Sequence, residues 1–444
     1  MGMGKHLSNS ILISAILIGL LSGSVQLKAI DLKTAAAIDQ EIEKNRAEII
    51  KIRRFLHMNP ELSNREYETS KLVANKLTAL GLEVKTGVAR TGVVGLLTGA
   101  LPGPTVAIRA DMDALPVEEQ NTFPYKSLNP GVMHACGHDV HTSIALGTAM
   151  VLSNFKDKIR GKIKFIFQPA EEGAPAGEEG GASLMIKEGV LADPPVRAIF
   201  GLHVWPDLKV GQVGYAEGYT MASSDSLTLT IKGKSAHGAR PQEGIDAIVI
   251  AAEVINNLQN ISSRLVDPTE PLVISIGKIQ GGVRSNIIAD KVVMEGTVRT
   301  LSAELRDQIP EMIEKIAAGI CQSYGASYNL DYERQLPPVY NHPEFVRLVI
   351  PWLFKSIGEA NVVEVRPQLV AEDFAYYAER IPAFYFFLGV KSPGQMTAAP
   401  LHSPNFNPDE RAISVGIKAM CHLVLNALEQ QASLKTSGEV ESVN

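Results

Sequence analysis

Met133-His-Ala-Cys-Gly-His-Asp-Val-His141 is the stretch on which the predicted fold depends, because it brings three histidines and a cysteine into nine residues. In extended backbone alternate side chains point the same way, so Cys136 and His138 can reach one ion while Gly137 lets the chain turn closely. Thiolate and imidazole donors favour a borderline-soft metal such as zinc. A single histidine or cysteine is more often a packed core residue, but clustering at ligand spacing predicts a metal site.

The composition is that of a globular chain large enough for two or three domains. The chain has 444 residues, of which 45% are hydrophobic and 20% are charged, so a sizeable core can be buried. A net charge of −6 and the lack of a Lys/Arg-rich run predict no nucleic-acid binding. The chain's cysteines are Cys136, Cys321 and Cys421, so no disulfide framework is expected.

Residues 1–29 have the pattern of a secretory signal peptide. Lys5 precedes the apolar run Ile11–Leu21, and the small residues Ser22 and Gly23 follow it. The run is short for a membrane span, which needs about 20 residues, although an uncleaved anchor is an alternative. We therefore expect a periplasmic or secreted protein that has no membrane contact after cleavage. No later segment is expected to cross a membrane.

Helices are predicted on both sides of the central part of the chain. An amphipathic pattern covers Ile30–Leu56, and Ser63 with Glu66 has the spacing of a capping box that starts a second helix. Near the end of the chain, Asn407 is expected to cap another helix with Pro408 at its first position.

Carboxylates and histidines follow several apolar strands. In an open α/β sheet the carboxyl ends of the strands form the edge where active sites lie. Taken alone, the first pair of aspartates could equally be a solvated turn. The predicted strands and the residues that follow them are Thr105–Ala110 with Asp111 and Asp113, Lys162–Phe167 with Glu171 and Glu172, Ala198–Leu202 with His203, and Ala383–Gly389 with His402.

The Glu171-Glu172 pair suggests two different roles. Adjacent side chains in extended backbone face opposite ways, so one carboxylate can bind an ion while its neighbour faces the space beside it. The pair could instead be surface charge, but it follows a buried-looking strand and precedes the Gly-rich loop Gly173–Gly181. Asp111 and Asp113 are spaced to bind a metal or to orient a metal-bound histidine.

Residues 220–334 have a different pattern and predict an inserted domain. Strands and helices follow there in the order βαββαβ, which is a complete small α+β domain. Its loops Lys234–Pro241 and Gly281–Asp290 could be simple glycine turns. Because they carry His237 and Asn286, we interpret the domain as a lid that presents hydrogen-bond donors to a substrate.

Several motifs, in the same order along residues 40–430, resemble those of the metal-dependent amidohydrolases. The matching branch contains N-acyl-amino-acid amidohydrolases, hippurate hydrolase and auxin (indoleacetyl)-amino-acid conjugate hydrolases, which are relatives of aminoacylase and the zinc carboxypeptidases. The motifs are Arg109–Pro116, His134–His141, Gln168–Gly173, Ser235–Pro241, Gly281-Gly282 with Asn286, and Leu401–Ser403.

This resemblance implies an α/β fold. A mixed-sheet, zinc-peptidase-like catalytic domain would comprise residues 30–219 and 335–430, and a ferredoxin-like lid and dimerisation domain would comprise residues 220–334. The resemblance also implies two divalent metal ions, with zinc, manganese, cobalt and nickel as candidates. The implied residues are Cys136, His138, Glu172, His203 and His402 as ligands, Glu171 as general base, Asp113 as the orienting residue, and His237 and Asn286 as substrate-binding residues.

The implied reaction is hydrolysis of an N-acyl amino acid to a carboxylic acid and a free amino acid, with Glu171 taking the proton of an activated water. A metallo-carboxypeptidase or dipeptidase is the alternative within this chemistry. A periplasmic solute-binding protein and a degenerate family member have no use for Glu171 beside an intact ligand set. A homodimer formed through the lid is expected, and the polar residues 431–444 are expected to be a disordered tail.

Overall fold

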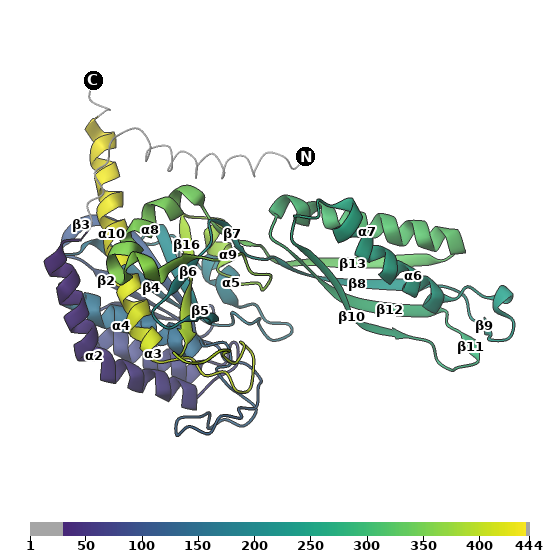
Figure 1. Ribbon diagram of the computed structural model, residues 1–444, viewed down its shortest axis with the longest axis horizontal. Helices are drawn as coiled ribbons and strands as arrows, with labels where there is room; N and C mark the ends of the chain where they lie inside the picture. The colour runs from purple at the N-terminus through teal and green to yellow at the C-terminus, as the bar shows by residue number, and fades with distance from the viewer. Residues whose placement is uncertain (1–29, 441–444) are drawn as a thin grey trace. The chain divides into compact units, whose positions relative to one another are not determined.

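The computed structural model describes residues 30–440, which form two compact units (Figure 1). The first unit contains the chain up to Gly218, residues Asn341–Val365 and the chain from Tyr376, and the second contains Tyr219–Tyr340 and Arg366–Ala375. The predicted insertion, residues 220–334, ends earlier than the second unit and lacks its separate second segment. The predicted signal peptide, residues 1–29, lies outside the described residues.

The first unit is built on an eight-stranded mixed sheet with the order β1-β2-β4-β3-β5-β16-β6-β15. The neighbouring strands β4, β3, β5 and β16 run parallel, and almost all of β16 is buried. Strands buried on both faces need continuous apolar runs, as the sequence has here. The strands are β1 (Glu83–Val88), β2 (Gly92–Thr98), β3 (Leu101–Asp111), β4 (Arg160–Gln168), β5 (Val196–Lys209), β6 (Val213–Tyr215), β15 (Val362–Glu364) and β16 (Ala383–Lys391).

Helices cover this sheet and complete the core of the first unit. α4 and α10 contact β3, β4 and β5, while α2 packs against α4 and α8 packs against α10 (Figure 1). Almost every residue of α4 is buried, so α4 is a central helix of the unit. The helices are α2 (Leu32–Met58), α3 (Tyr67–Ala79), α4 (His138–Leu152), α5 (Gly181–Lys187), α8 (Pro343–Ile357), α9 (Ala375–Ala378) and α10 (Arg411–Val440).

The long helix α10 differs from its prediction in three ways. It begins at Arg411 and not at Pro408, and the Asp409 carboxylate accepts the hydrogen bond of the Arg411 N–H. It continues to Val440, so the segment predicted to be disordered from residue 431 is helical, with residues 441–444 outside the described part. Its window Arg411–Gln430 is long and apolar enough to cross a membrane, contrary to expectation, but 78% of that window is buried in the fold. Core packing therefore explains its apolar character.

The second unit has the βαββαβ order predicted from the sequence. Its sheet is antiparallel with the order β10-β12-β8-β13, which is the ferredoxin-like arrangement. Along β8, Leu227, Leu229 and Ile231 join the buried core while the alternate residues are more exposed, as expected for a sheet with one covered face. The elements are β8 (Ser224–Lys232), β9 (Ala236–His237), α6 (Ala247–Asn260), β10 (Leu272–Gly281), β11 (Ile287–Ile288), β12 (Lys291–Thr300), α7 (Ala303–Tyr324) and β13 (Ser327–Leu336). The short strands β7 (Gly218–Met221) and β14 (Val339–Asn341) form a separate two-stranded sheet.

The predicted capping box at the start of α3 is wrong. The Glu61 carboxylate accepts the N–H groups of Glu68 and Thr69 at 3.0 and 2.8 Å, and so satisfies the first turn of the helix. Neither Ser63 nor Glu66 makes a side-chain cap; both side chains bond residues elsewhere in the first unit. The spacing of a capping box arose here from residues that serve another part of the fold.

Candidate metal centre

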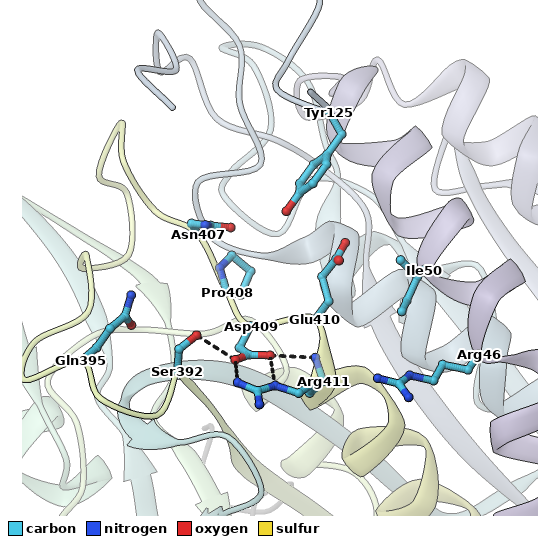
Figure 2. A pocket seen from close by; sticks show the side chains of 10 residues that line it. All are labelled: Arg46, Ile50, Tyr125, Ser392, Gln395, Asn407, Pro408, Asp409, Glu410 and Arg411. Carbon is cyan, nitrogen blue, oxygen red and sulfur yellow. Dashed lines mark hydrogen bonds and ion pairs between the residues drawn. The ribbon is translucent and has the colours of Figure 1, made fainter. Parts of the chain in front are cut away.

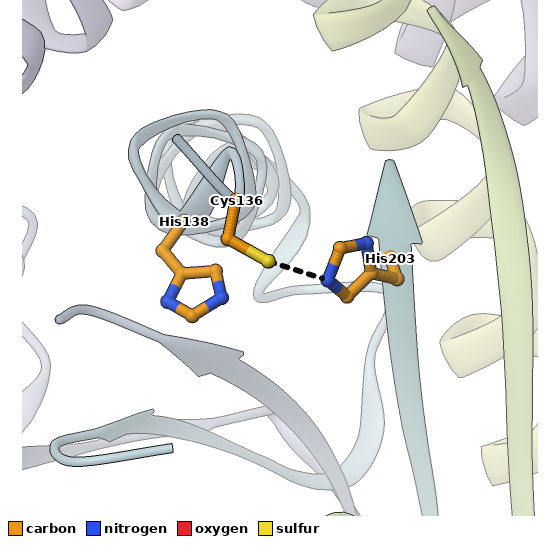
Figure 3. A group of neighbouring side chains, drawn as sticks. All are labelled: Cys136, His138 and His203. Carbon is orange, nitrogen blue, oxygen red and sulfur yellow. Dashed lines mark hydrogen bonds between the residues drawn. The ribbon is translucent and has the colours of Figure 1, made fainter. Parts of the chain in front are cut away.

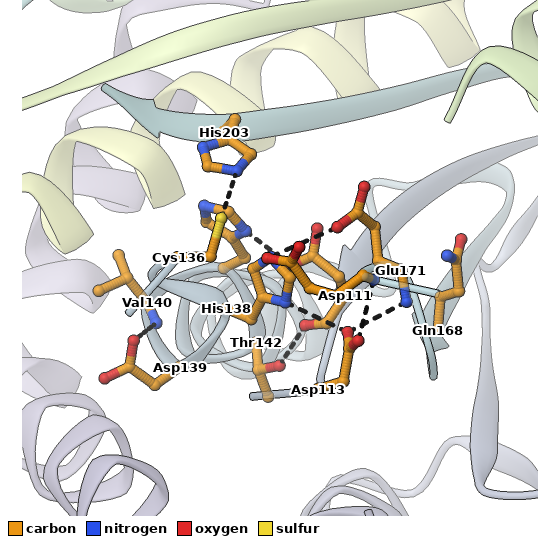
Figure 4. Close-up of polar contacts among 12 residues, drawn as sticks. Asp111, Asp113, Cys136, His138, Asp139, Val140, Thr142, Gln168, Glu171 and His203 are labelled. Carbon is orange, nitrogen blue, oxygen red and sulfur yellow. Dashed lines mark hydrogen bonds and ion pairs between the residues drawn. The ribbon is translucent and has the colours of Figure 1, made fainter. Parts of the chain in front are cut away.

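The predicted site residues of the first unit come together at one side of the parallel strands. This agrees with the expected edge of an α/β sheet. Figure 4 shows five of them, namely Asp113, Cys136, His138, Glu171 and His203. β5 does not end at residue 202 as predicted, so its histidine lies within the strand and is held by sheet hydrogen bonding. The positions are Asp113 after β3, Glu171 and Glu172 after β4, His203 within β5, His402 in the loop after β16, and Cys136 and His138 at the start of α4.

Cys136 lies between two groups of potential metal ligands. Its Sγ atom is 3.3 Å from His203 Nε2 and 3.2 Å from His402 Nε2, and Figure 3 shows the first of these contacts. Ligand atoms of Cys136, His138 and His203 lie within 4.8 Å of one another, and so do those of Cys136, Glu172 and His402. The thiol sulfur is thus common to both groups.

Hydrogen bonds on the far side of two imidazole rings leave their Nε2 atoms for the site. His138 Nδ1 donates to Asp113 Oδ1 at 3.2 Å, and His203 Nδ1 donates to the Val204 carbonyl at 2.8 Å. His138 Nε2 is buried and has no described hydrogen-bond partner. Metal-binding histidines have this arrangement, because the bonded nitrogen fixes the tautomer and the ring orientation.

Glu171 and Glu172 approach these histidines differently. Glu171 Oε2 is 3.8 Å from His138 Nε2, whereas Glu172 Oε1 is 3.9 Å from the same atom and 3.3 Å from His402 Nε2. Glu172 Oε1 is buried, and its 3.3 Å contact with His402 Nε2 is an ion-pair distance without good hydrogen-bond geometry. Glu172 therefore faces both ligand groups, and Glu171 stands beside one of them.

Asp111 and His141 also converge on His138, but their polar atoms are engaged elsewhere. His141 Nδ1 donates to Asp111 at 2.6 Å, and Arg109 donates to the other oxygen of that carboxylate at 2.6 Å. His141 Nε2 accepts the Val204 backbone N–H at 2.9 Å. Both nitrogens of His141 are used, so this third histidine of the opening stretch supports the site and does not ligate.

Carboxylates dominate the electrostatics of the site. Burial and the carboxylates of Glu172 and Glu171 raise the pKa of the Cys136 thiol well above its usual value. Burial opposes protonation of His138, but the neighbouring aspartates outweigh it and raise the pKa of that histidine to about 10. Divalent cations would relieve this repulsion. Together with the unpartnered His138 Nε2 atom, this group of carboxylates means that the residues present fit a metal centre.

The backbone of the site is held in unusual conformations. Gly137 has a φ of 86°, and a Cβ atom there would lie 2.5 Å from Val204 Cγ2. His402 and Ala170 have φ values of 62° and 52°, a region that residues with a side chain seldom adopt. Such conformations persist where the surrounding structure holds them, and they occur often at functional sites.

A buried charge cluster behind α4 is absent from the sequence predictions. Asp139 Oδ2 lies 2.8 Å from His57 Nδ1 and 2.9 Å from Arg53 Nε, and His57 Nε2 lies 3.1 Å from Glu119 Oε1. Asn121 donates both to Glu119 and to the backbone of the loop after β16. Asp139 is the member of this cluster that lies in the stretch Met133–His141. The others come from distant segments, and no local pattern marks them.

A separate polar pocket of about 280 Å³ contains none of the predicted site residues (Figure 2). Its two carboxylates already have partners, because Asp409 accepts from Arg411 and Ser392 while Glu410 pairs with Arg54. The pocket's acidic groups are therefore satisfied within the fold. The lining residues are Arg46, Ile50, Tyr125, Ser392, Gln395, Asn407, Pro408, Asp409, Glu410 and Arg411.

The second unit brings His237 and Asn286 together within its own fold. β9 pairs with β11, and the Gly238 N–H donates to the Asn286 carbonyl at 2.8 Å. The His237 side chain is exposed, and its Nδ1 atom accepts the Ala239 N–H at 3.0 Å. The two predicted substrate-binding residues therefore share one surface cluster of loops, and their role stays a prediction.

Known proteins match the chain over most of its length. Residues 107–426 match peptidase family M20/M25/M40. An N-acyl-L-amino acid amidohydrolase of Geobacillus stearothermophilus is 44% identical over 311 residues, which are 70% of this chain and 82% of the relative. Thermostable carboxypeptidase 2 of Saccharolobus solfataricus is 43% identical over 379 residues, which are 85% of this chain and 94% of the relative.

A solved structure also matches the chain. The Bacillus subtilis YXEP protein, described as a dinuclear metal-binding peptidase from the M20 family, is 37% identical with a TM-score of 0.75. The match covers 87% of this chain and 99% of that protein. The family and fold expected from the sequence motifs are confirmed.

Replacing Gly137 by alanine should weaken metal binding. The added Cβ would meet Val204 Cγ2, which must displace the segment that carries Cys136 and His138. Such a change near ligands is expected to weaken metal affinity by about 10- to 100-fold. Gly177→Ala is the control, since its φ of 81° is similar but nothing lies within 4 Å of the new Cβ.

The measurement is zinc titration together with thermal unfolding of both variants. Gly177→Ala should lose about 1–2 kcal/mol of folding free energy through the positive φ and should bind zinc as the wild type does. Gly137→Ala should lose more folding free energy, because the clash with Val204 adds to the same backbone strain. Wild-type zinc affinity in Gly137→Ala would contradict the geometry of this site.

Proposed function

The chain belongs to peptidase family M20/M25/M40, and from this premise we propose that it hydrolyses the amide bond of N-acyl amino acids. The products are a carboxylic acid and a free amino acid. A relative at 44% identity is named for this activity. The observation that carries the proposal is the set of donors converging on one site with Glu171 beside it, namely Cys136, His138, Glu172, His203 and His402.

The proposed cofactor is a pair of divalent metal ions. Cys136 lies in two donor groups at once, and a related protein of known structure is described as dinuclear. His138 and His203 would hold one ion with Cys136, and Glu172 and His402 would hold the other. Bound cations would polarise the amide carbonyl and lower the pKa of water. The donor set suits zinc, and manganese, cobalt and nickel are the other candidates.

Glu171 is the proposed general base. Its carboxylate stands beside the ligand groups, where it can take a proton from water and pass it to the leaving amine. Asp113 keeps His138 oriented through the 3.2 Å hydrogen bond to its Nδ1 atom. His237 and Asn286 are proposed to bind the substrate or its developing oxyanion.

Carboxypeptidase or dipeptidase activity is the second candidate, because a relative at 43% identity is named a carboxypeptidase. A carboxypeptidase or dipeptidase would use the same metal ligands and the same base. It would differ in the acyl group that the substrate-binding site accepts. A solute-binding protein would need no general base beside a metal ligand, and a degenerate member would not need the whole donor set. The pair Glu171 and Glu172 therefore favours an enzyme.

Two further proposals concern location and assembly. We propose export to the periplasm or beyond the cell, supported by the sequence of residues 1–29. We also propose a homodimer formed through residues 220–334, supported by the family resemblance. N-terminal sequencing of the exported protein tests the first, and light scattering tests the second by reporting one chain mass or two.

A panel of N-acetyl, N-benzoyl and N-indoleacetyl amino acids, long-chain N-acyl amino acids and dipeptides tests the proposed function. Release of a free amino acid should occur with at least one N-acyl substrate, should stop after chelation, and should return with zinc, manganese, cobalt or nickel, because the metals supply the Lewis acid. Turnover of dipeptides alone would favour the second candidate. Ligand binding without turnover of any substrate would contradict both.

Glu171→Gln and Glu172→Gln should separate base from ligand. Glu172→Gln should lose affinity for at least one ion, because a neutral amide is a poorer ligand for a divalent cation than a carboxylate. Glu171→Gln should bind both ions but turn over about 10²- to 10⁴-fold more slowly, the usual contribution of a general base. Metal stoichiometry and amine release are measured side by side. Loss of metal in Glu171→Gln, or normal turnover in it, would show that the roles are assigned wrongly.

His237→Ala should leave the metal content unchanged and lower turnover by about 10²-fold, the cost of one lost oxyanion donor. Arg240→Ala is the matched control, because Arg240 is exposed in the same loop and pairs with Glu243. Metal analysis and steady-state kinetics decide the outcome. Normal turnover in His237→Ala would reject its role in substrate binding.

A further inference from the structure

Ala170, the residue before the glutamate pair, is held in a left-handed turn. Its φ is 52°, a conformation disfavoured for a residue that carries a Cβ atom. Its N–H donates to Glu66 Oε1 at 2.9 Å. Glu66 is fully buried and also accepts a hydrogen bond from Thr91 Oγ1. A distant carboxylate therefore stabilises the turn from which the glutamate pair emerges.

The next two N–H groups of the chain are held in the same way. Glu171 N–H and Glu172 N–H donate to the two oxygens of Asp113, at 3.1 and 3.0 Å. Three successive N–H groups thus point at two buried carboxylates, one at Glu66 and two at Asp113. The direction in which the Glu171 and Glu172 side chains leave this turn therefore depends on the carboxylates of Glu66 and Asp113.

We infer that Glu66 is a positioning residue, which fixes the Ala170 turn and thereby places Glu171 and Glu172 at the metal centre. The inference rests on the proposed roles of that pair. Glu66 touches neither the substrate nor the metals in this scheme, and it acts through the backbone of Ala170.

Other contacts of residues 63–66 support the same positioning role. Ser63, three residues before Glu66, donates to Asp113 Oδ2 at 2.7 Å. Asn64 donates to the Glu178 carboxylate at 3.0 Å and to the Glu179 carbonyl at 3.1 Å. Residues 63–66 therefore contact the loop after β4 near its beginning and near its end. The function of this segment is to shape that loop, and the cap of α3 is supplied by Glu61.

The burial of Glu66 beside a second carboxylate is costly. Burial and the nearby Asp113 raise the pKa of Glu66 to about 7. A hydrophobic residue would avoid this cost, so the acceptor oxygen has a role beyond packing. That oxygen is present whether the carboxyl group is ionised or not, and a glutamine side chain also provides it.

Two variants of similar size separate the hydrogen bond from the packing. Glu66→Met fills the space but offers no oxygen to Ala170, whereas Glu66→Gln keeps an acceptor. Thr91→Val is the matched control, because it removes the other partner of Glu66 and leaves the bond to Ala170. All three are made in the full chain, with Co²⁺ as the probe metal followed by visible absorption.

Glu66→Met should bind Co²⁺ about 10- to 100-fold more weakly at one site, the usual effect of losing support behind a ligand. Deuterium uptake by the peptide that contains residues 170–172 should rise in the same variant. Glu66→Gln and Thr91→Val should stay near the wild type in both measurements. Wild-type Co²⁺ affinity and uptake in Glu66→Met would overturn the inference, as would equal losses in the Met and Gln variants.

Two further outcomes are decided by the same measurements. If Glu66→Met does not fold, the other proteins decide the outcome. Slow deuterium uptake by residues 170–172 of the wild type, together with normal Co²⁺ affinity in Glu66→Gln, supports the inference. Rapid uptake by these residues in the wild type overturns it. If the wild type binds Co²⁺ but hydrolyses no N-acyl substrate, the proposed function fails on its own. The positioning role of Glu66 is still decided, because neither readout depends on turnover.

Discussion

The Asp113 carboxylate is the point on which the site depends. It is almost fully buried and accepts four hydrogen bonds, from Ser63 Oγ, His138 Nδ1, Glu171 N–H and Glu172 N–H. Burial disfavours its charge, but the hydrogen bond from His138 and its other partners outweigh this and keep its pKa low. One ionised group therefore orients a histidine and two glutamates relative to one another, and it ties the end of β3 to the start of α4.

The arrangement around Asp113 is unfavourable for folding and suited to binding cations. Carboxylates gather there around a buried thiol, and the backbone adopts left-handed conformations at Ala170 and His402. Strain and like charge of this kind lower stability unless the rest of the fold opposes them. The parallel strands β4, β3, β5 and β16 provide that opposition, because their ends are fixed by sheet pairing on both sides. Metal ions would remove the electrostatic part of the cost.

At the start of α3 the sequence pattern predicted the position of the helix correctly but assigned its cap to the wrong residues. Ser63 and Glu66 have the spacing of a capping box, and a helix does begin there. Yet Ser63 bonds Asp113 and Glu66 bonds Ala170, whereas Glu61 caps the helix. A hydroxyl can donate to any nearby acceptor, and a carboxylate can accept from any nearby donor. The choice between a helix end and an active-site loop depends on which partner the fold brings close.

The sequence by itself determined the type of chemistry, the strand ends that carry it, and the order of elements in the second unit. These features are local, because neighbouring residues determine the ligand types, the apolar runs and the helical spacing. The family resemblance implied that His402 and Cys136 share a site, and the structure brings them together across 266 positions. Only the tertiary structure decided that His141 supports the site through Val204 and that Glu66 reaches Ala170. In each case the deciding partner comes from a distant segment. A side chain with several possible hydrogen-bond partners is assigned to one of them only when folding fixes their distances and excludes water.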